Sequence, residues 1–197
     1  MQSTMNTQTR PMIHRPNGID RDALVACIDA ITEDAAQGMT TWRVSSRWVG
    51  GTRSDHRVDG FSIGGRQVRR PFTLKVDEPQ ELCGTNEFPN PQEYFFSAVN
   101  ACMMVGYSAV ATLMGIRLTM LEIETTGDID LRGFLGIDDS VTRGCDQLRQ
   151  TVRIAGEATE EQFAELHRVV LATSPNFDHV TRAVPMKSRL EVVKQDS

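Results

Sequence analysis

The sequence predicts an α+β domain with antiparallel sheets, and three observations lead to this prediction. An uncharged, mostly apolar segment of 23 residues, 94–116, is long enough for a central buried helix. On both sides of it, stretches of alternating apolar and polar residues are typical of half-buried strands. A regular alternation of strand and helix, which would indicate a parallel sheet, does not run through the sequence.

Residues 1–38 are expected to form a tail and one helix attached to the main domain, residues 39–197. The tail is polar and contains proline and glycine. From Asp20 to about Gln37, apolar residues recur at helical spacing, and Gly38 follows as a stop signal.

The next segment, residues 41–76, is expected to form two or three antiparallel strands. Trp42 and Val44 alternate with polar neighbours, and two Gly-Gly pairs punctuate the segment. Such pairs are typical of tight turns, which fits antiparallel strands in this segment.

The uncharged segment is expected to be one long helix that begins at Pro91. Asn90 is a suitable N-cap, Glu93 places a carboxylate in the first turn, and Gly115 ends the helix. The segment could span a bilayer by length, but polar side chains spread along it favour burial inside protein. Because the helix is apolar on every side, one small sheet cannot cover it, which predicts a homodimer.

The second half of the chain is expected to add a strand pair, an amphipathic helix and a last strand. Residues 117–134 and 148–156 show the alternation of an antiparallel pair. A Thr-Glu-Glu-Gln capping box begins a helix over residues 160–173, and Pro175 ends it. The last strand is expected over about residues 179–193.

The composition excludes several classes of function. A formal charge of -5 and a pI near 5.4 argue against a nonspecific nucleic-acid binder or a protein of anionic membrane surfaces. No apolar signal segment is visible at the start, so a cytoplasmic location is expected. No nucleotide or cofactor motif occurs, and neither a cofactor nor a metal is expected. A partial calcium-loop match at residues 128–139 fails because Arg132 stands where an oxygen ligand is needed.

The four cysteines, Cys27, Cys83, Cys102 and Cys145, are the remaining candidates for chemistry. Cys102 lies near the middle of the long helix, where a free cysteine is either a small buried hydrophobic residue or a reactive thiol. Cys83 lies in a Gly-Thr-Asn loop and is expected to be the most exposed. The residues alone leave both interpretations of Cys102 open.

Three segments, GTNEFPNPQEYFFSAVNAC, LEIETTGDIDLRG and ATSPNFDHVTRAVPM, together resemble the OsmC-like family of osmotically inducible and organic-hydroperoxide-resistance proteins. The resemblance covers roughly residues 40–193. Its most specific elements are the Gly-Thr-Asn/Asn-Pro loop, the cysteine on the helix that follows, and the Ser-Pro segment after the second helix. It implies an intertwined homodimer in which antiparallel sheets wrap two long central helices, with thiol sites at the subunit interface.

The resemblance also implies a chemistry for Cys102. Active members of the family use a peroxidatic cysteine at this position and a second cysteine, just before the later proline, that forms a disulfide with it. Here Ser174 precedes Pro175, so the usual resolving thiol is replaced by a hydroxyl. A peroxidase cycle would therefore need Cys83 or an external thiol.

The family places a cation and a carboxylate near the reactive thiol, and the resemblance assigns these positions in this chain. Lys75 would supply the cation. The carboxylate position directly after Asn-Pro is Gln92, and Glu93 follows one place later. A cation near the sulfur would favour the thiolate form.

These inferences give two candidate functions. The first is a thiol-based hydroperoxide reductase, active in oxidative stress, that uses Cys102 and an external thiol reductant. The alternative is a noncatalytic binding module that holds an apolar small molecule in an interface pocket lined by Phe95, Met103, Met104 and Tyr107.

Overall fold

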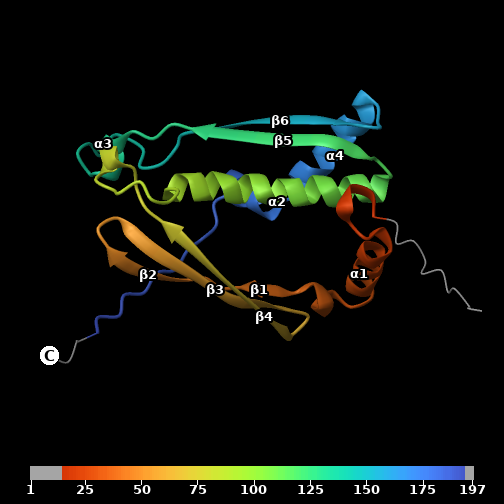
Figure 1. Ribbon diagram of the computed structural model, residues 1–197, viewed down its shortest axis with the longest axis horizontal. Coiled ribbons are helices and arrows are strands. Elements are labelled where there is room, and N and C mark those ends of the chain that lie inside the picture. Colours follow the sequence, from red (N-terminus) through yellow and green to blue (C-terminus); the bar gives the residue numbers. More distant parts are fainter. Residues whose placement is uncertain (1–14, 194–197) are drawn as a thin grey trace, which may run out of the picture.

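The computed structural model describes residues 15–193 and places helix α2 (Pro91–Met114) between two layers (Figure 1). Strands β5 (Leu118–Gly127) and β6 (Leu148–Gly156) lie on one side of α2, and a four-stranded sheet lies on the other. Both sheets are antiparallel, which confirms the predicted α+β class. Most of the predicted N-terminal tail lies outside the described residues.

The four-stranded sheet is built on β3 (Arg53–Ile63) and β4 (Arg66–Val76). Strand β4 pairs with one edge of β3 along most of its length. The other edge of β3 pairs with β1 (Thr40–Trp42) near the end of β3 and with β2 (Ser45–Gly50) near its start. The segment therefore contains four strands rather than the two or three predicted, because residues 43–44 interrupt the first one.

The N-terminal helix α1 (Arg21–Glu33) begins at Asp20, whose carboxylate accepts from the Ala23 N–H at 3.0 Å. Short 3-10 turns, η1 (Pro16–Gly18) and η2 (Ala35–Gly38), flank it. In η1, the Asn17 side chain donates to the Ile116 carbonyl and accepts from the Leu118 N–H, both at 2.9 Å. The start of the described chain is thus fixed to the end of α2.

Helix α2 begins and ends where the sequence predicts. Asn90 and Glu93 form a reciprocal capping box, and Gly115 ends the helix in the left-handed region at φ 72°. Helix α4 (Glu160–Thr173) likewise begins with the predicted box, between Thr159 and Gln162.

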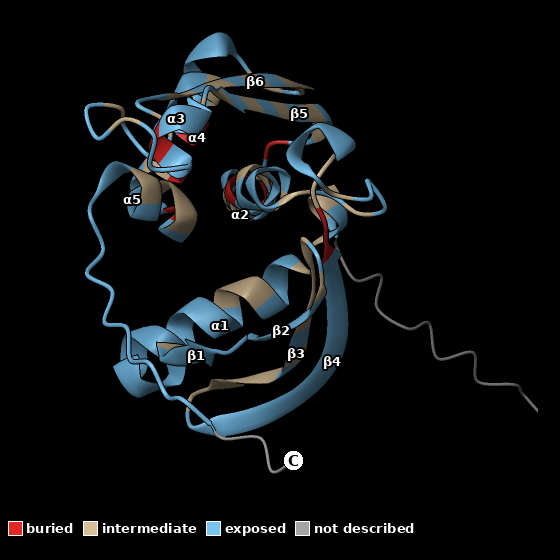
Figure 2. Cartoon of the chain, turned by 90° about the vertical axis from the view of Figure 1, so that its left-hand side faces the viewer, coloured by how far each residue is buried: buried red, intermediate tan, exposed pale blue. Residues whose placement is uncertain are grey.

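The core of the single chain lies where α2, α4 and the β5–β6 pair meet. Its buried members come mainly from α2 and α4 and are Val99, Met103, Tyr107, Ala111, Ile116, Leu166 and Val170. Figure 2 shows buried positions gathered around α2, whereas α1 and the four-stranded sheet are mostly exposed. The four-stranded sheet and α1 therefore contribute little to this chain's own core.

The end of the chain differs from the prediction. Residues 175–181 form helix α5 (Pro175–Thr181) instead of the start of a strand, because Ser174 accepts from the Phe177 N–H as an N-cap and Pro175 occupies the first helical position. Residues 182–193 form no strand within the chain. Two short elements, η3 (Gln80–Leu82) and α3 (Leu131–Phe134), complete the fold.

Among the described helices, α2 is the one long and apolar enough to cross a membrane. It packs against α4, α5 and β5, and five of its residues are buried. These contacts identify α2 as the core helix of the fold. Nevertheless, only 28% of its most apolar stretch is buried within the chain.

Candidate functional site around Cys102

Cys102 lies on α2 opposite the junction of α4 and α5. The Ser174 hydroxyl donates to Cys102 Sγ at 3.4 Å. Ser174 is 4% exposed, whereas Cys102 is half-buried. The residue that stands at the position of a second cysteine is therefore the polar neighbour of the candidate nucleophile.

Backbone capping fixes Ser174 at this place. Its N–H donates to the Val170 carbonyl at 2.9 Å at the end of α4, and its hydroxyl caps α5. The Asn176 side chain donates to the Ala98 carbonyl at 2.8 Å, one helical turn before Cys102. These bonds hold the α4–α5 junction against α2.

A glycine on α2 permits this close approach of the helices. A Cβ atom at Gly106 would lie 3.3 Å from Val170 Cγ1 of α4. A larger side chain there would push α4 away from α2 and change the separation of Ser174 from Cys102. Gly106 therefore supports the site from one turn beyond the cysteine.

The cation and carboxylate that the resemblance assigns have other partners in the single chain. The ammonium of Lys75 lies 5.2 Å from the ring centroid of Phe88. Glu93 accepts from the Asn90 N–H at 2.7 Å in the capping box, which holds its carboxylate at the start of α2. The structure does not bring either group to Cys102, and their catalytic role stays a prediction.

Gln92 and Phe95 line a cavity of about 580 Å³ that also contains Cys145. Cys83 is exposed at the end of η3, with a left-handed backbone at φ 66°. All four cysteines are free thiols. Neither Cys83 nor Gln92 has a described contact with Cys102, so neither role is established within one chain.

The loop before α2 is organised by Asp77, which is fully buried. Its carboxylate accepts from the hydroxyls of Thr52 and Thr85 at 2.7 and 2.6 Å and from two loop N–H groups. The Thr85 hydroxyl makes the largest contribution to lowering the pKa of Asp77 well below its usual range. At Gly84 a Cβ would clash with the Glu78 carbonyl. Within the Gly-Thr-Asn motif, Gly84 therefore permits the close approach of the backbone to Glu78, and Thr85 binds Asp77.

The four residues predicted to line one pocket are divided among different surroundings. Met103 and Tyr107 belong to the core, Phe95 lines the cavity beside Cys145, and Met104 is half-buried. Helix geometry explains the division, because Phe95 and Tyr107 are about 18 Å apart along the axis. A single pocket formed by all four is not present within one described chain.

The sequence profile of the OsmC-like protein family matches residues 84–189, which is more than half of the chain. This chain belongs to the OsmC-like family. The matched segment contains the Gly-Thr-Asn loop, Cys102 and Ser174, the same elements on which the sequence resemblance depends. No curated protein matches the sequence significantly.

Solved OsmC-like structures share the fold at low identity. An OsmC-like protein from Mycoplasma pneumoniae has a TM-score of 0.58 and 13% identity, covering 73% of this chain and 89% of that chain. A Psychrobacter arcticus 273-4 protein, named for osmotic stress induction and a detoxification response, has a TM-score of 0.51 and 18% identity, covering 72% of this chain and 88% of that chain. An OsmC-like protein of unknown function from Vibrio cholerae O1 biovar eltor has a TM-score of 0.52 and 13% identity, covering 71% of this chain and 93% of that chain.

A second polar pair of this OsmC-like protein joins α2 to α4, and it was not predicted from the sequence. The hydroxyl of Tyr107, which is 1% exposed, is hydrogen-bonded to Nδ1 of His167 on α4. Burial raises the pKa of Tyr107 to about 12. The sequence signal was partial: a buried tyrosine needs a partner for its hydroxyl, but that His167 supplies it follows only from the packing of α4 on α2.

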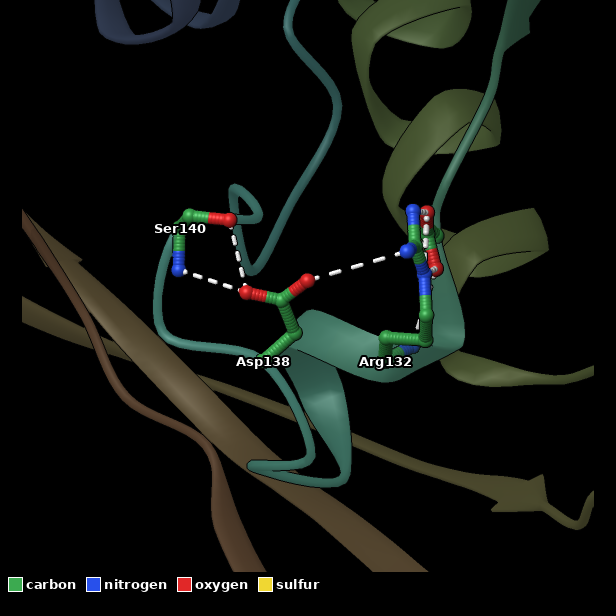
Figure 3. Close-up of polar contacts among 4 residues, drawn as sticks. Arg132, Asp138 and Ser140 are labelled. Atoms are coloured by element: carbon green, nitrogen blue, oxygen red, sulfur yellow. Dashed lines mark hydrogen bonds and ion pairs between the residues drawn. The ribbon is translucent and has the colours of Figure 1, made fainter.

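The acidic loop after β5 is held by Arg132 (Figure 3). Its Nη2 donates to Asp130 at 2.6 Å, and its Nη1 lies 3.6 Å from Asp138. Asp138 also accepts from the N–H and hydroxyl of Ser140 at 3.0 and 2.6 Å. The guanidinium lowers the pKa of Asp130 to about 2 by bonding to its charged form. Arg132 thus occupies the carboxylate of Asp130, the third position of the partial calcium-loop match.

Proposed function

We propose that this protein reduces organic hydroperoxides at Cys102 and is regenerated by an external thiol. The hydrogen bond from the Ser174 hydroxyl to Cys102 Sγ carries the proposal. A donor at the sulfur favours the thiolate, and the thiolate is the nucleophilic form of cysteine. Cys102 is half-buried, and the proposal requires its sulfur to be open to a small substrate.

The reaction consumes one hydroperoxide and two thiols. The Cys102 thiolate attacks the terminal oxygen of the hydroperoxide, the O–O bond breaks, and the alkoxide takes a proton and leaves as an alcohol. One external thiol then converts the Cys102 sulfenic acid to a mixed disulfide and releases water. A second thiol attacks that disulfide, which restores Cys102 and yields the oxidised reductant.

An external thiol is favoured over Cys83 as the reductant. Ser174 stands beside Cys102 but has no sulfur with which to form a disulfide. Cys83 lies in the loop organised by Asp77 and has no described contact with the helix position of Cys102. The reductant therefore comes from solution, in keeping with the expected cytoplasmic location and a role in oxidative stress.

We further propose that the working form is a homodimer whose second copy covers α2 and completes the site. Val105 on α2 is 70% exposed and Trp48 on β2 is 73% exposed, which is costly for apolar side chains on a monomer. In the extended C-terminal segment, Val184, Met186 and Leu190 lie two and four residues apart, so they share one side of an extended chain, and all three are exposed. This alternation is typical of a strand that pairs with another sheet edge.

A second copy could also supply the cation for Cys102. Lys75 lies on strand β4 of the four-stranded sheet. In a dimer, the uncovered layer of one subunit would face α2 of the other. A positive group positioned in this way would lower the pKa of the Cys102 thiol.

The second candidate function is binding of an apolar small molecule, and a pair of adjoining cavities favours it. One cavity, of about 370 Å³, is lined by Tyr107, His167 and apolar residues of α4 and β6. Gln150 and Phe177 line both this cavity and the one beside Cys145. Together they could hold an elongated apolar ligand with a polar group at Tyr107 and His167.

Replacing Ser174 tests the proposed cycle. In Ser174→Cys, organic hydroperoxide should produce an internal disulfide with Cys102, because the two side chains already meet at 3.4 Å. We expect wild type to consume cumene hydroperoxide with added dithiothreitol, and Cys102→Ser to consume none above background. Ser140→Cys is the matched control, because its added thiol lies in the exposed loop after α3 and should not pair with Cys102. Peroxide consumption equal in wild type and Cys102→Ser would contradict the proposal.

A further inference from the structure

The four-stranded sheet is strongly basic although the chain as a whole is acidic. Residues 40–76 contain seven arginines and one lysine but only two aspartates and no glutamate. The formal charge of the whole chain is -5, so the remaining residues are strongly acidic. Positive charge is therefore concentrated in one layer of the molecule.

A groove of about 540 Å³ on this sheet collects three of the arginines, Arg43, Arg57 and Arg69. Arg43 follows β1, Arg57 belongs to β3 and Arg69 belongs to β4. Because neighbouring strands lie about 5 Å apart, guanidinium groups from three adjacent segments can converge on one ligand. The volume is in the range of small-molecule sites.

Polar side chains extend the groove between the arginines. Thr41, Ser62 and Gln67 are successive cross-strand partners on β1, β3 and β4, and all three line the groove. The pairing of β3 with β4 shifts at Gly60, where a Cβ would come 2.2 Å from the Val68 carbonyl. Such a bulge bends the strands, which gives the sheet a hollow at this point.

Two of the three guanidinium groups have no acidic partner among the described residues. Arg57 Nε donates to Asp59 at 2.6 Å. Arg43 and Arg69 form no ion pair within residues 15–193, and Asp59 is the one acidic residue that lines the groove. The groove therefore has excess positive charge with which to bind an anion.

We propose that this groove binds a small molecule that carries two or more phosphate groups. The guanidinium group of arginine binds phosphate through paired N–H donors. The hydroxyls of Thr41 and Ser62 and the amide of Gln67 add further donors. A compact ligand fits the charge distribution better than a long polyanion. A long polyanion would extend past the basic sheet and come close to the acidic remainder of the molecule, which would repel it.

This site is independent of the proposed peroxide chemistry. It lies on β1, β3 and β4, whereas Cys102 and Ser174 lie on α2 and at the α4–α5 junction. Replacing Arg43 or Arg69 therefore leaves the contact between Ser174 and Cys102 intact.

Calorimetric titration of the full-length protein with inorganic tripolyphosphate tests the proposal. At about 0.1 M salt, we expect saturable binding that weakens as salt rises. Arg43→Gln and Arg69→Gln should each weaken binding by about tenfold or more, and the double variant more strongly. Arg153→Gln is the matched control, because Arg153 lies on β6 and pairs with Glu124.

Three results would overturn the proposal. These are an unchanged affinity in the double variant, an equal loss in Arg153→Gln, and orthophosphate binding as tightly as tripolyphosphate. A double-stranded oligonucleotide that displaces tripolyphosphate with higher affinity would also overturn the assignment of a small ligand. Circular dichroism of each variant checks that loss of binding does not reflect unfolding.

Discussion

The N-terminal and C-terminal halves of this chain differ in how many apolar residues they bury. Of the eight buried hydrophobic residues within residues 15–193, seven lie from Val99 to Val170, and only Val76 belongs to the N-terminal half. The N-terminal half forms a long-stranded sheet and helix α1, which has no buried residue. The C-terminal half therefore has its own core, whereas the N-terminal half depends on a surface that the single chain does not provide.

The residues of the proposed thiol site are divided between the two halves of the chain. Cys102 and Ser174 are positioned by bonds within the C-terminal half, so their contact needs only one chain. The described contacts of Lys75 lie instead around the loop before α2 and the start of that helix. If the N-terminal layer covers a second copy, folding of that layer and completion of the thiol site become one event.

The largest difference is expected from matched leucine truncations. Leu166 is fully buried in the C-terminal core, so Leu166→Ala should lower the free energy of unfolding by about 2–5 kcal/mol. Leu74 on β4 is 43% exposed, and Leu74→Ala should cost less than about 1 kcal/mol in a monomer. Urea unfolding measures both. If both substitutions lower the free energy of unfolding equally at low protein concentration, the proposed difference between the halves does not exist.

A charge on the exposed face of α2 should break the dimer without unfolding the chain. Val105→Arg places a guanidinium where the second copy is proposed to pack, and we expect at least a hundredfold weaker association, or about 2.8 kcal/mol. Ala164→Arg on the exposed side of α4 is the control and should have no effect. Light scattering over a concentration series reports the result. A wild-type protein that is monomeric at micromolar concentration would refute the dimer.

A smaller effect should appear in the alkaline titration of the two tyrosines. Burial raises the pKa of Tyr107 to about 12, above the usual value near 10. The raised value stabilises the fold below pH 10, and this contribution is lost as pH rises from 10 toward 12. Absorbance at 295 nm of wild type minus Tyr107→Phe should give a midpoint near 12. A midpoint near 10 would mean that the C-terminal core is open to solvent around Tyr107.

The sequence predicted those elements whose signals are local. Asn90, Pro91 and Gly115 mark the ends of α2, and Thr159 marks the start of α4, because capping depends on a few adjacent residues. The last strand failed for a related reason. A strand was predicted over about residues 179–193, but a strand needs a partner edge, and residues 182–193 pair with no strand within residues 15–193.

The candidate site was predicted in part. The family resemblance identified Cys102 and Ser174 as corresponding positions, and the structure brings them into contact. The position of Lys75 could not be predicted, because side-chain direction on β4 depends on strand pairing that composition does not determine. The bond between Tyr107 and His167 joins residues 60 positions apart and depends on how α2 and α4 pack.

The most direct test of the account is to identify the cysteine that reacts first with an organic hydroperoxide. One equivalent of cumene hydroperoxide is added with a dimedone-type sulfenic acid trap, and the labelled peptides are quantified by mass spectrometry. We expect Cys102 to be labelled at least about tenfold faster than Cys27, Cys83 or Cys145, and its peptide to carry no label in Cys102→Ser. Equal, slow labelling of all four cysteines, unchanged at the other three by Cys102→Ser, would contradict it and favour the binding module.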